Sequence, residues 1–198
     1  TLHYSDGAVV QGGTWASAAR SGGVLAYQGC ATGNGLFAIA TDSAIIRGAT
    51  LAECAGATLS VAAPGGATLR GITFDHFYQH FVCWGTYGTA TGGRHGAWKS
   101  TDLVTWTGLG PQRHSKGVSQ FGTSQDGVWL QIIDSAWGGL GTISEAYASL
   151  DGGVTWRYAG LLEDTFLASA GCNQIAYGHG RFAALGAARA WFSGRFAT

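Results

Sequence analysis

The sequence contains no methionine, only two prolines and few charged residues. Lys+Arg and Asp+Glu each number 11 in 198 residues, so the formal net charge is zero. This balance excludes the broad basic surface that sequence-independent binding to nucleic acid requires. The missing methionine predicts a processed or excised chain. Arginine far outnumbers lysine, and with abundant Ala and Gly this favours a bacterial or phage gene.

Long apolar runs and helical periodicity are also missing. Although 46% of the residues are hydrophobic, no segment approaches the roughly 20 uninterrupted apolar residues of a membrane-spanning helix, so we expect no membrane insertion. No long stretch keeps apolar residues at i, i+3, i+4 and i+7, which argues against long helices. A chain of this length can form one domain with a sizeable core.

The four cysteines lack the CxxC or Cys/His spacing of a zinc site, and we expect no cofactor. Two interpretations stay open. Cys30 and Cys54 are close in sequence and could form a disulfide in an exported protein. Cys83 lies inside the apolar run FVCW and is more typical of a small core residue; the sequence leaves the state of Cys172 open.

What the sequence does contain is a series of short runs rich in Val, Ile, Phe, Tyr and Trp. Gly-, Asn- and Asp-rich turns separate these runs, which predicts β-hairpins. The runs repeat as a unit of strands that ends in an acidic turn leading to Trp. The closing positions are Trp15, approximately Leu59, Trp106 and Trp156, so the period is 44 to 50 residues.

A four-stranded propeller blade needs about 40 to 50 residues. We therefore predict an all-β fold: a single small β-propeller over 1–198, with four blades of four antiparallel strands. In one arrangement the chain termini pair and close the ring, which removes exposed sheet edges. In the alternative, AWFSGRF (190–196) finishes its own blade and the N-terminal hairpin is an addition. The first arrangement predicts blades at 20–61, 68–107, 117–158, and 170–198 with 1–16.

The stretch SLDGGVTW (149–156) fits the pattern Ser-any-Asp-any-Gly-any-Thr-Trp at every specified position. The chain thereby resembles the Asp-box, or bacterial neuraminidase repeat, family of β-propellers. STDLVTW (100–106) is similar to a shortened version, and residues 5–15 to a stretched one. The matching residues are Ser149, Asp151, Gly153, Thr155 and Trp156 in the full copy, Ser100, Asp102, Thr105 and Trp106 in the shortened one, and Ser5, Asp6, Gly7, Thr14 and Trp15 in the stretched one.

In that family the Asp-box is a structural hairpin between the third and fourth strands of a blade, remote from the ligand face. The residues agree with this role, because an Asp can accept backbone N–H bonds in a tight turn and Gly153 can take a positive φ. The resemblance also suggests sialidase activity. A sialidase needs three Arg, a Tyr–Glu pair and an Asp on six blades, and this chain is too short, so no catalytic residue is transferred.

A glycosidase of another kind would need two carboxyl groups about 5 to 9.5 Å apart in one pocket. The remaining candidates are Asp75, Glu145, Glu163 and Asp164, and nothing in their sequence context pairs them. A metal site built from Asp75, His76 and His80 is a further alternative. A loop followed by a strand does not impose ligand geometry, so we expect no metal.

Aromatic and polar residues gather instead in three loops, where they could stack on a sugar or pack against the blade edge. We predict a non-catalytic binding or adhesion module with carbohydrate or a glycoconjugate as the leading ligand class, extracellular, secreted or virion-associated. Two alternatives stay open: a protein-interaction or assembly module of a phage or secreted bacterial protein, and a glycoside hydrolase. The predicted ligand-binding residues are His76, Tyr78, His80, Tyr87, Arg94, His95 and Trp137.

Overall fold

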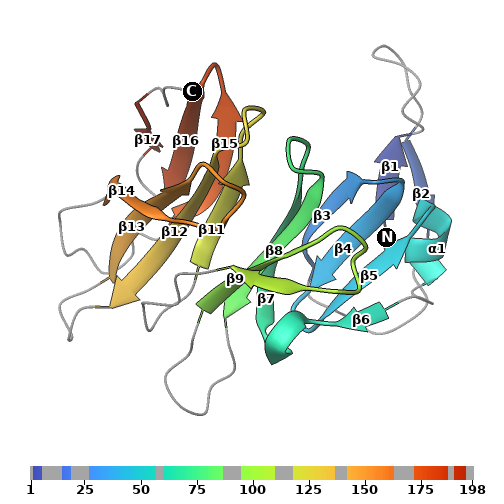
Figure 1. Cartoon of the computed structure of the whole chain (residues 1–198). Helices are drawn as coiled ribbons and strands as arrows, with labels where there is room; N and C mark the ends of the chain where they lie inside the picture. The colour runs from blue at the N-terminus through green and yellow to red at the C-terminus, as the bar shows by residue number, and fades with distance from the viewer. Residues whose placement is uncertain are drawn as a thin grey trace.

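Four antiparallel β-sheets follow one another along the chain as the blades of a four-bladed propeller (Figure 1). This confirms the predicted all-β propeller. The structure is a computed structural model, and it describes residues 2–5, 15–18, 27–56, 60–86, 95–109, 118–136, 142–162, 172–186 and 190–194.

Three of the sheets contain four strands each, in chain order from the inner to the outer strand. The first sheet contains β3 (Tyr27–Gly33), β4 (Leu36–Thr41), β5 (Ala44–Gly48) and β6 (Ser60–Ala62). The second contains β7 (Thr68–Asp75), β8 (His80–Thr86), β9 (His95–Ser100) and β10 (Thr107–Leu109). The third contains β11 (Val118–Thr123), β12 (Trp129–Ala136), β13 (Thr142–Ser149) and β14 (Arg157–Leu161).

The fourth sheet has three strands among the described residues, with β17 at its outer edge. The first two strands of the chain pair only with each other, so the predicted completion of the fourth blade by residues 1–16 is not observed in the described ranges. Of the segment 190–196, which would finish the blade in the alternative arrangement, residues 195–196 lie outside the described ranges. These strands are β1 (Leu2–Ser5), β2 (Trp15–Ala18), β15 (Cys172–Gly178), β16 (Arg181–Gly186) and β17 (Ala190–Phe192).

Two-residue turns connect the inner hairpins of the first and fourth sheets. Asn34 and Gly35 have φ of 49° and 71°, and His179 and Gly180 have φ of 52° and 74°. Two successive positive φ values are typical of a type I′ turn, whose twist matches that of the strands on either side. The Asn-Gly and His-Gly pairs of the sequence therefore fix the turns of these two hairpins.

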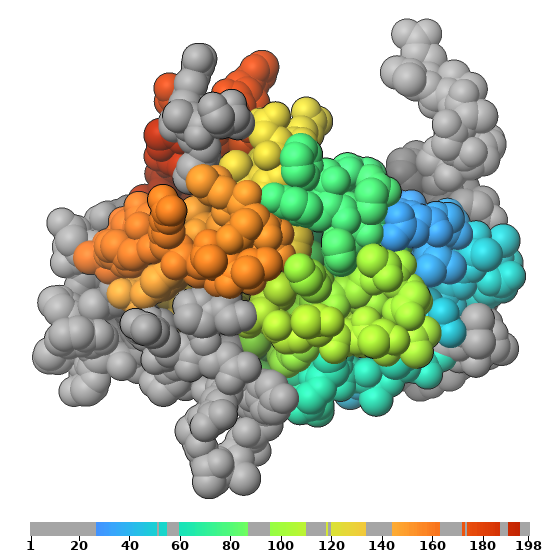
Figure 2. Space-filling view, viewed as in Figure 1, coloured from blue at the N-terminus to red at the C-terminus, as the bar shows by residue number. Residues whose placement is uncertain are grey.

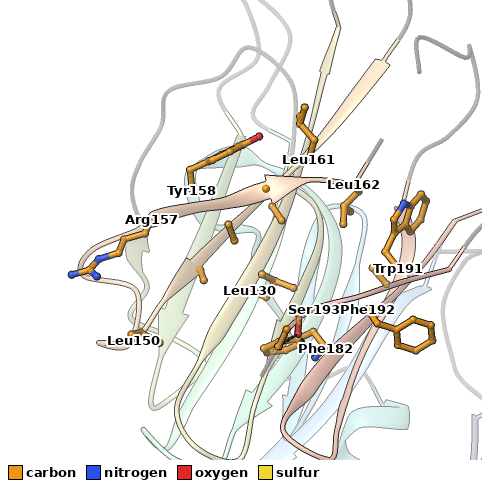
Figure 3. A pocket seen from close by; sticks show the side chains of 16 residues that line it. Leu130, Leu150, Arg157, Tyr158, Leu161, Leu162, Phe182, Trp191, Phe192 and Ser193 are labelled. Atoms are coloured by element: carbon orange, nitrogen blue, oxygen red, sulfur yellow. Dashed lines mark hydrogen bonds between the residues drawn. The ribbon is translucent and has the colours of Figure 1, made fainter. Parts of the chain in front are cut away.

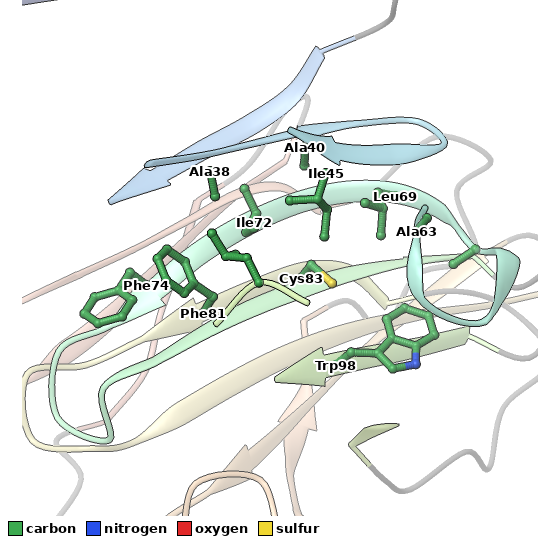
Figure 4. Close-up of a cluster of buried hydrophobic side chains, with 12 residues drawn as sticks. Ala38, Ala40, Ile45, Ala63, Leu69, Ile72, Phe74, Phe81, Cys83 and Trp98 are labelled. Atoms are coloured by element: carbon green, nitrogen blue, oxygen red, sulfur yellow. The ribbon is translucent and has the colours of Figure 1, made fainter. Parts of the chain in front are cut away.

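Neighbouring sheets pack face to face through apolar side chains, with the inner strands in closest contact. Figure 4 shows the cluster between the first and second sheets, which includes Ile45, Ile72 and Phe81. Glycines on the inner strands permit this approach, because a Cβ at Gly122 would lie 2.6 Å from Ile175 of the next sheet. In the space-filling view the third sheet lies directly against the second (Figure 2).

The described part of the chain contains one α-helix, α1 (Leu51–Gly56). It lies between the third and fourth strands of the first blade, which has no acidic turn at this place. Thr50 and Glu53 form its N-terminal cap: the Thr50 hydroxyl accepts the Glu53 N–H at 3.2 Å, and Glu53 accepts the Ala49 N–H at 2.7 Å. The sequence TLAE carries this signal at the spacing of a capping box. In the described ranges, no helix is long and apolar enough to cross a membrane.

None of the four cysteines forms a disulfide, so the Cys30–Cys54 disulfide that the sequence left open is absent from the structure. Cys54, Cys83 and Cys172 are buried, whereas Cys30 is exposed. Burial raises the pKa of the Cys83 thiol far above its ordinary value, so this residue is an inert part of the core.

Candidate functional site

The turn between β7 and β8 carries the first group of predicted site residues, and both oxygens of its Asp75 carboxylate accept hydrogen bonds. Asp75 is completely buried and accepts the Phe77 N–H at 2.8 Å. Its second oxygen accepts the indole N–H of Trp129, which belongs to the third sheet and is also completely buried. Asp75 therefore joins two sheets, and this occupies the oxygens that a metal or a substrate would need.

Tyr78 extends this junction. Its hydroxyl donates to the Leu150 carbonyl at 3.0 Å, and its ring lies over Gly152. Burial raises the pKa of Tyr78 above its ordinary value, and the negative charges of Asp75 and Asp151 add to the shift. Tyr78 is thus a packing residue with an occupied hydroxyl, as the alternative interpretation of this loop proposed.

The two histidines of this turn do not converge with Tyr78 on a cavity. His76 is exposed and contacts the edge of the Phe74 ring at 5.0 Å between centroids. His80 is half-buried at the start of β8, paired with Asp75, and its Nδ1 is buried without a hydrogen-bond partner. Among the described residues, no group of three His, Cys, Asp or Glu could hold a metal ion.

Of the other predicted ligand residues, the structure describes only the backbone of His95. The strand β8 begins at His80 and ends at Thr86, which pairs with His95. Seven extended residues span about 20 Å, so the His95 backbone lies far from the 75–79 turn. Tyr87, Arg94 and Trp137 lie outside the described residues, as does the side chain of His95.

The 149–156 turn is held together by Ser149 and Asp151. Asp151 accepts the N–H groups of Val154 and Thr155 at 3.1 and 2.9 Å and the Thr155 hydroxyl at 2.6 Å. The Ser149 hydroxyl accepts the Gly153 N–H at 2.9 Å. The side chains of Ser149 and Asp151 thus bond to the turn itself, and the two side chains have a structural role here.

The 100–106 turn repeats this geometry with one residue fewer. Asp102 accepts the N–H groups of Val104 and Thr105, both at 2.8 Å, and Ser100 accepts the Leu103 N–H at 2.9 Å. Leu103 takes a φ of +61° at the place where the longer turn has glycine. The Trp106 indole N–H is buried without a partner, whereas Trp156 donates to the Gly153 carbonyl at 3.2 Å.

Hydrogen bonding lowers the pKa of both turn carboxylates to about 2. For Asp151 the largest cause is the Thr155 hydroxyl, followed by the Thr155 amide. For Asp102 it is the Thr105 amide, followed by that of Val104. Both carboxylates therefore stay ionised far into the acid range, which suits an acceptor of turn amides and does not suit a general acid.

Each of these turns also receives polar contacts from the preceding sheet. Arg47 donates to the Asp102 carbonyl at 3.3 Å, and Lys99 donates to the Gly152 carbonyl at 3.0 Å. These two basic residues hold equivalent positions. Arg47 precedes Gly48, which pairs with Phe37 in β4, and Lys99 precedes Ser100, which pairs with Phe81 at the same place in β8. In the third sheet this position holds Ala148, so the series ends before the fourth sheet.

A groove of about 530 Å³ lies where the series ends, between the outer strands of the third and fourth sheets. We call it the β14–β17 groove. Figure 3 shows Leu130 and Phe182 at its floor, Tyr158 and Leu161 along one side, and Trp191 and Phe192 along the other. The lining residues are Leu130, Ala146, Ala148, Leu150, Arg157, Tyr158, Ala159, Gly160, Leu161, Leu162, Phe182, Ala184, Trp191, Phe192, Ser193 and Gly194.

The groove exists because two space-filling parts are missing there. Between the second and third sheets, Gly153 packs between Leu109 and Trp129, and a Cβ at Gly153 would lie 2.8 and 2.7 Å from them. At the junction between the third and fourth sheets, Ala159 and Gly160 of β14 occupy the position that Leu109 occupies in β10. The described part of the fourth sheet provides no equivalent of the 149–156 turn. Among the described residues, no side chain fills the space between these two sheets.

The chemistry of the β14–β17 groove is aromatic and aliphatic, with one positive charge at its end. Tyr158, Leu161 and Phe192 are 54%, 50% and 70% exposed, which is unusual for side chains of this size. Arg157 lies at the end of the groove beside Leu150 (Figure 3). Sequence reasoning missed these residues because they follow no motif; the signal was the aromatic pair in AWFSGRF.

The carboxylates that a glycosidase would need are not brought together around this groove. Its lining contains no Asp or Glu among the described residues. Of the predicted candidates, Asp75 joins two sheets, and Glu145 lies on β13 outside the lining. Glu163 and Asp164 lie outside the described residues. The groove can bind a ligand through aromatic faces, backbone edges and one guanidinium group.

The fold is that of a small β-propeller with a lateral, largely apolar groove. No protein-family model and no curated protein matches the chain. Among solved structures, it is similar to the Bombyx mori GH32 β-fructofuranosidase BmSUC1, with a TM-score of 0.51 and 13% identity over 82% of this chain and 40% of that one. A second structure, a single-residue variant of that enzyme in complex with sucrose, has a TM-score of 0.49, 14% identity and the same coverage. The chain thus spans two fifths of the enzyme's length, and the likeness concerns the fold.

Proposed function

We propose that this propeller is a non-catalytic binding module whose ligand lies in the β14–β17 groove. The observation that carries the proposal is an open, aromatic-walled groove at the one sheet junction of the described chain that lacks its filling turn. We further propose that the 100–106 and 149–156 turns are Asp-boxes with a structural role, since their carboxylates are saturated by their own turns.

Carbohydrate is the leading ligand class of this proposal. The ring faces of Tyr158, Trp191 and Phe192 suit stacking on the apolar face of a sugar, and Arg157 and Ser193 provide polar groups beside them. The similarity to a β-fructofuranosidase supports the same class. We also propose an extracellular or virion-associated location, where glycoconjugates are available.

A protein-interaction or assembly function is the second candidate, and one observation favours it. Among the described residues, the outer strand of the fourth sheet, β17, has a neighbour on one side only, whereas the first three sheets each have a fourth strand at that place. An unpaired strand edge beside an apolar groove suits an extended polypeptide.

A glycan array that includes fructans and sialosides, followed by calorimetry on the glycans it identifies, tests the leading class. We expect Tyr158→Ala to weaken binding about tenfold, which corresponds to about 1.4 kcal/mol. Tyr27→Ala is the matched control, because Tyr27 is 51% exposed and lies outside the groove. Equal loss in both variants, or no bound glycan at all, argues against carbohydrate in the groove. Release of a sugar product from a bound glycan argues for the glycosidase.

A further inference from the structure

The strand β17 ends at the position at which the 100–106 turn begins in the second sheet and the 149–156 turn begins in the third. Ser193 exchanges hydrogen bonds with Phe182: its N–H donates to the Phe182 carbonyl, and its hydroxyl accepts the Phe182 N–H, both at 2.9 Å. In the strand register, Ser100 lies opposite Phe81 and Ser149 opposite Trp129 at the same place. Ser193 is therefore the equivalent of the two serines that open a turn.

In the second and third sheets, a tryptophan directly before the fourth strand lies opposite that serine. Lys99 pairs with Thr107 and Ala148 with Arg157, so one further step of each register places Ser100 opposite Trp106 and Ser149 opposite Trp156. The fourth sheet has the serine but, in the described chain, neither the tryptophan nor the fourth strand.

The chain carries a strand with these properties at its N-terminus. In the β1–β2 hairpin, Ser5 pairs directly with Trp15, and β2 continues from Trp15 to Ala18. This is the register of Ser100 and Trp106 in the second sheet and of Ser149 and Trp156 in the third. Apart from each other, β1 and β2 make no extensive contact with any other described element.

The hairpin and the groove lie at opposite ends of one molecule. Figure 1 shows β1 and β2 beside the first sheet and β17 at the far end of the row of sheets. A β1–β2 hairpin that occupies the groove therefore comes from another copy. Two copies that exchange hairpins form a closed pair in which each groove is filled.

We propose that β2 of a second copy adds to the free edge of β17, antiparallel to it, with Trp15 opposite Ser193 and its indole in the β14–β17 groove. This inference rests on the proposed role of the groove as a binding surface. Main-chain hydrogen bonds to the strand edge supply affinity, and the indole supplies specificity for this register. The same groove then serves two ligands, and association between copies competes with carbohydrate.

Analytical ultracentrifugation of the full chain tests the proposal. We expect a dimer that dissociates on dilution, and monomers for Trp15→Ala and Leu161→Asp at the concentration where the unmodified chain is dimeric. Val104→Asp is the matched control, because Val104 is 46% exposed, Leu161 is 50% exposed, and only Leu161 lines the groove. A mixture of the Trp15→Ala and Leu161→Asp chains should regain a dimer, since one copy keeps the groove and the other the hairpin.

Circular dichroism confirms that the variants are folded. A monomeric unmodified chain at all concentrations, or a dimer that persists in Leu161→Asp, overturns the exchange. Glycan binding by Trp15→Ala separates this inference from the proposed carbohydrate function, because that variant keeps the groove. If Trp15→Ala binds glycans while the unmodified chain never dimerises, only the exchange fails. If the dimer forms as expected and Trp15→Ala binds no glycan, only the carbohydrate function fails.

Discussion

At the scale of single residues, Asp75 is the side chain whose replacement reports most directly on its role. Its two oxygens accept one backbone N–H and one indole N–H in a fully buried place. Asp75→Asn presents an amide N–H to one of these donors. We expect a loss of about 1 to 3 kcal/mol in the free energy of unfolding, because a buried donor loses its acceptor. Urea denaturation measures it.

Asp126→Asn is the control for this change. Asp126 lies in the corresponding turn of the third sheet, is exposed, and accepts the Tyr177 hydroxyl at 2.6 Å. An exposed amide oxygen can still accept that bond, so we expect a change within about 0.5 kcal/mol. Equal effects of the two substitutions would contradict the structural role of Asp75.

Asp151 allows a prediction of pH dependence. Its pKa is lowered from 3.8 to about 2 in the folded chain. The carboxylate therefore stabilises the fold fully above its ordinary pKa, and this contribution is lost as the pH falls from about 4 through about 2. We expect Asp151→Asn to flatten the acid side of the stability curve in this window. A carboxyl NMR titration of Asp151 with a midpoint near 3.8 would show that the turn does not hold the charge.

The sequence indicated the turn carboxylates correctly but could not indicate the role of Asp75. The partners of Asp151 lie within four residues, so a local pattern specifies them. The indole partner of Asp75 is 54 residues away, on another blade. From the sequence alone, Asp75 in an aromatic loop looks like a metal ligand or a catalytic acid, and only the packing of two sheets shows otherwise.

At the scale of elements, Gly153 tests how tightly the 149–156 turn packs between two sheets. It has a φ of +82°, and an added Cβ would lie 2.7 Å from Trp129 and 2.8 Å from Leu109. Gly35 has a φ of +71°, but an added Cβ meets nothing within 4 Å. We expect Gly153→Ala to cost about 2 to 4 kcal/mol and Gly35→Ala about 1 kcal/mol. Denaturant unfolding measures both, and equal costs would mean that the turn is not packed.

Sequence patterns predicted the strands better than they predicted what joins them. Apolar runs such as LFAIA (36–40) and GITF (71–74) lie inside β4 and β7 because alternation and β-branched content act locally. The helix α1 was not expected, since its six residues are too few for helical periodicity to show. The groove was not expected either, because it arises from small residues, Ala159 and Gly160, at a junction that other blades fill.

At the scale of the whole molecule, the blades form a series. A turn of the next sheet closes each of the first two junctions in this series. The first two junctions have the 100–106 and 149–156 turns, with Arg47 and Lys99 bonded across them. The third junction is the β14–β17 groove. Among the described residues the series stops at β17, and a strand edge of this kind can pair with another chain.

Hydrogen exchange tests this picture in the intact protein. The strands β6 and β17 are both three-residue outer edges, but only β17 borders the groove. At low concentration we expect the amides of both to exchange quickly. At high concentration the amides of 190–194 should exchange at least about tenfold more slowly, because a second copy pairs with them, while those of 60–62 should not change. In Trp15→Ala the concentration dependence should disappear. Protection that rises equally in both strands would indicate unspecific association and not a docked strand.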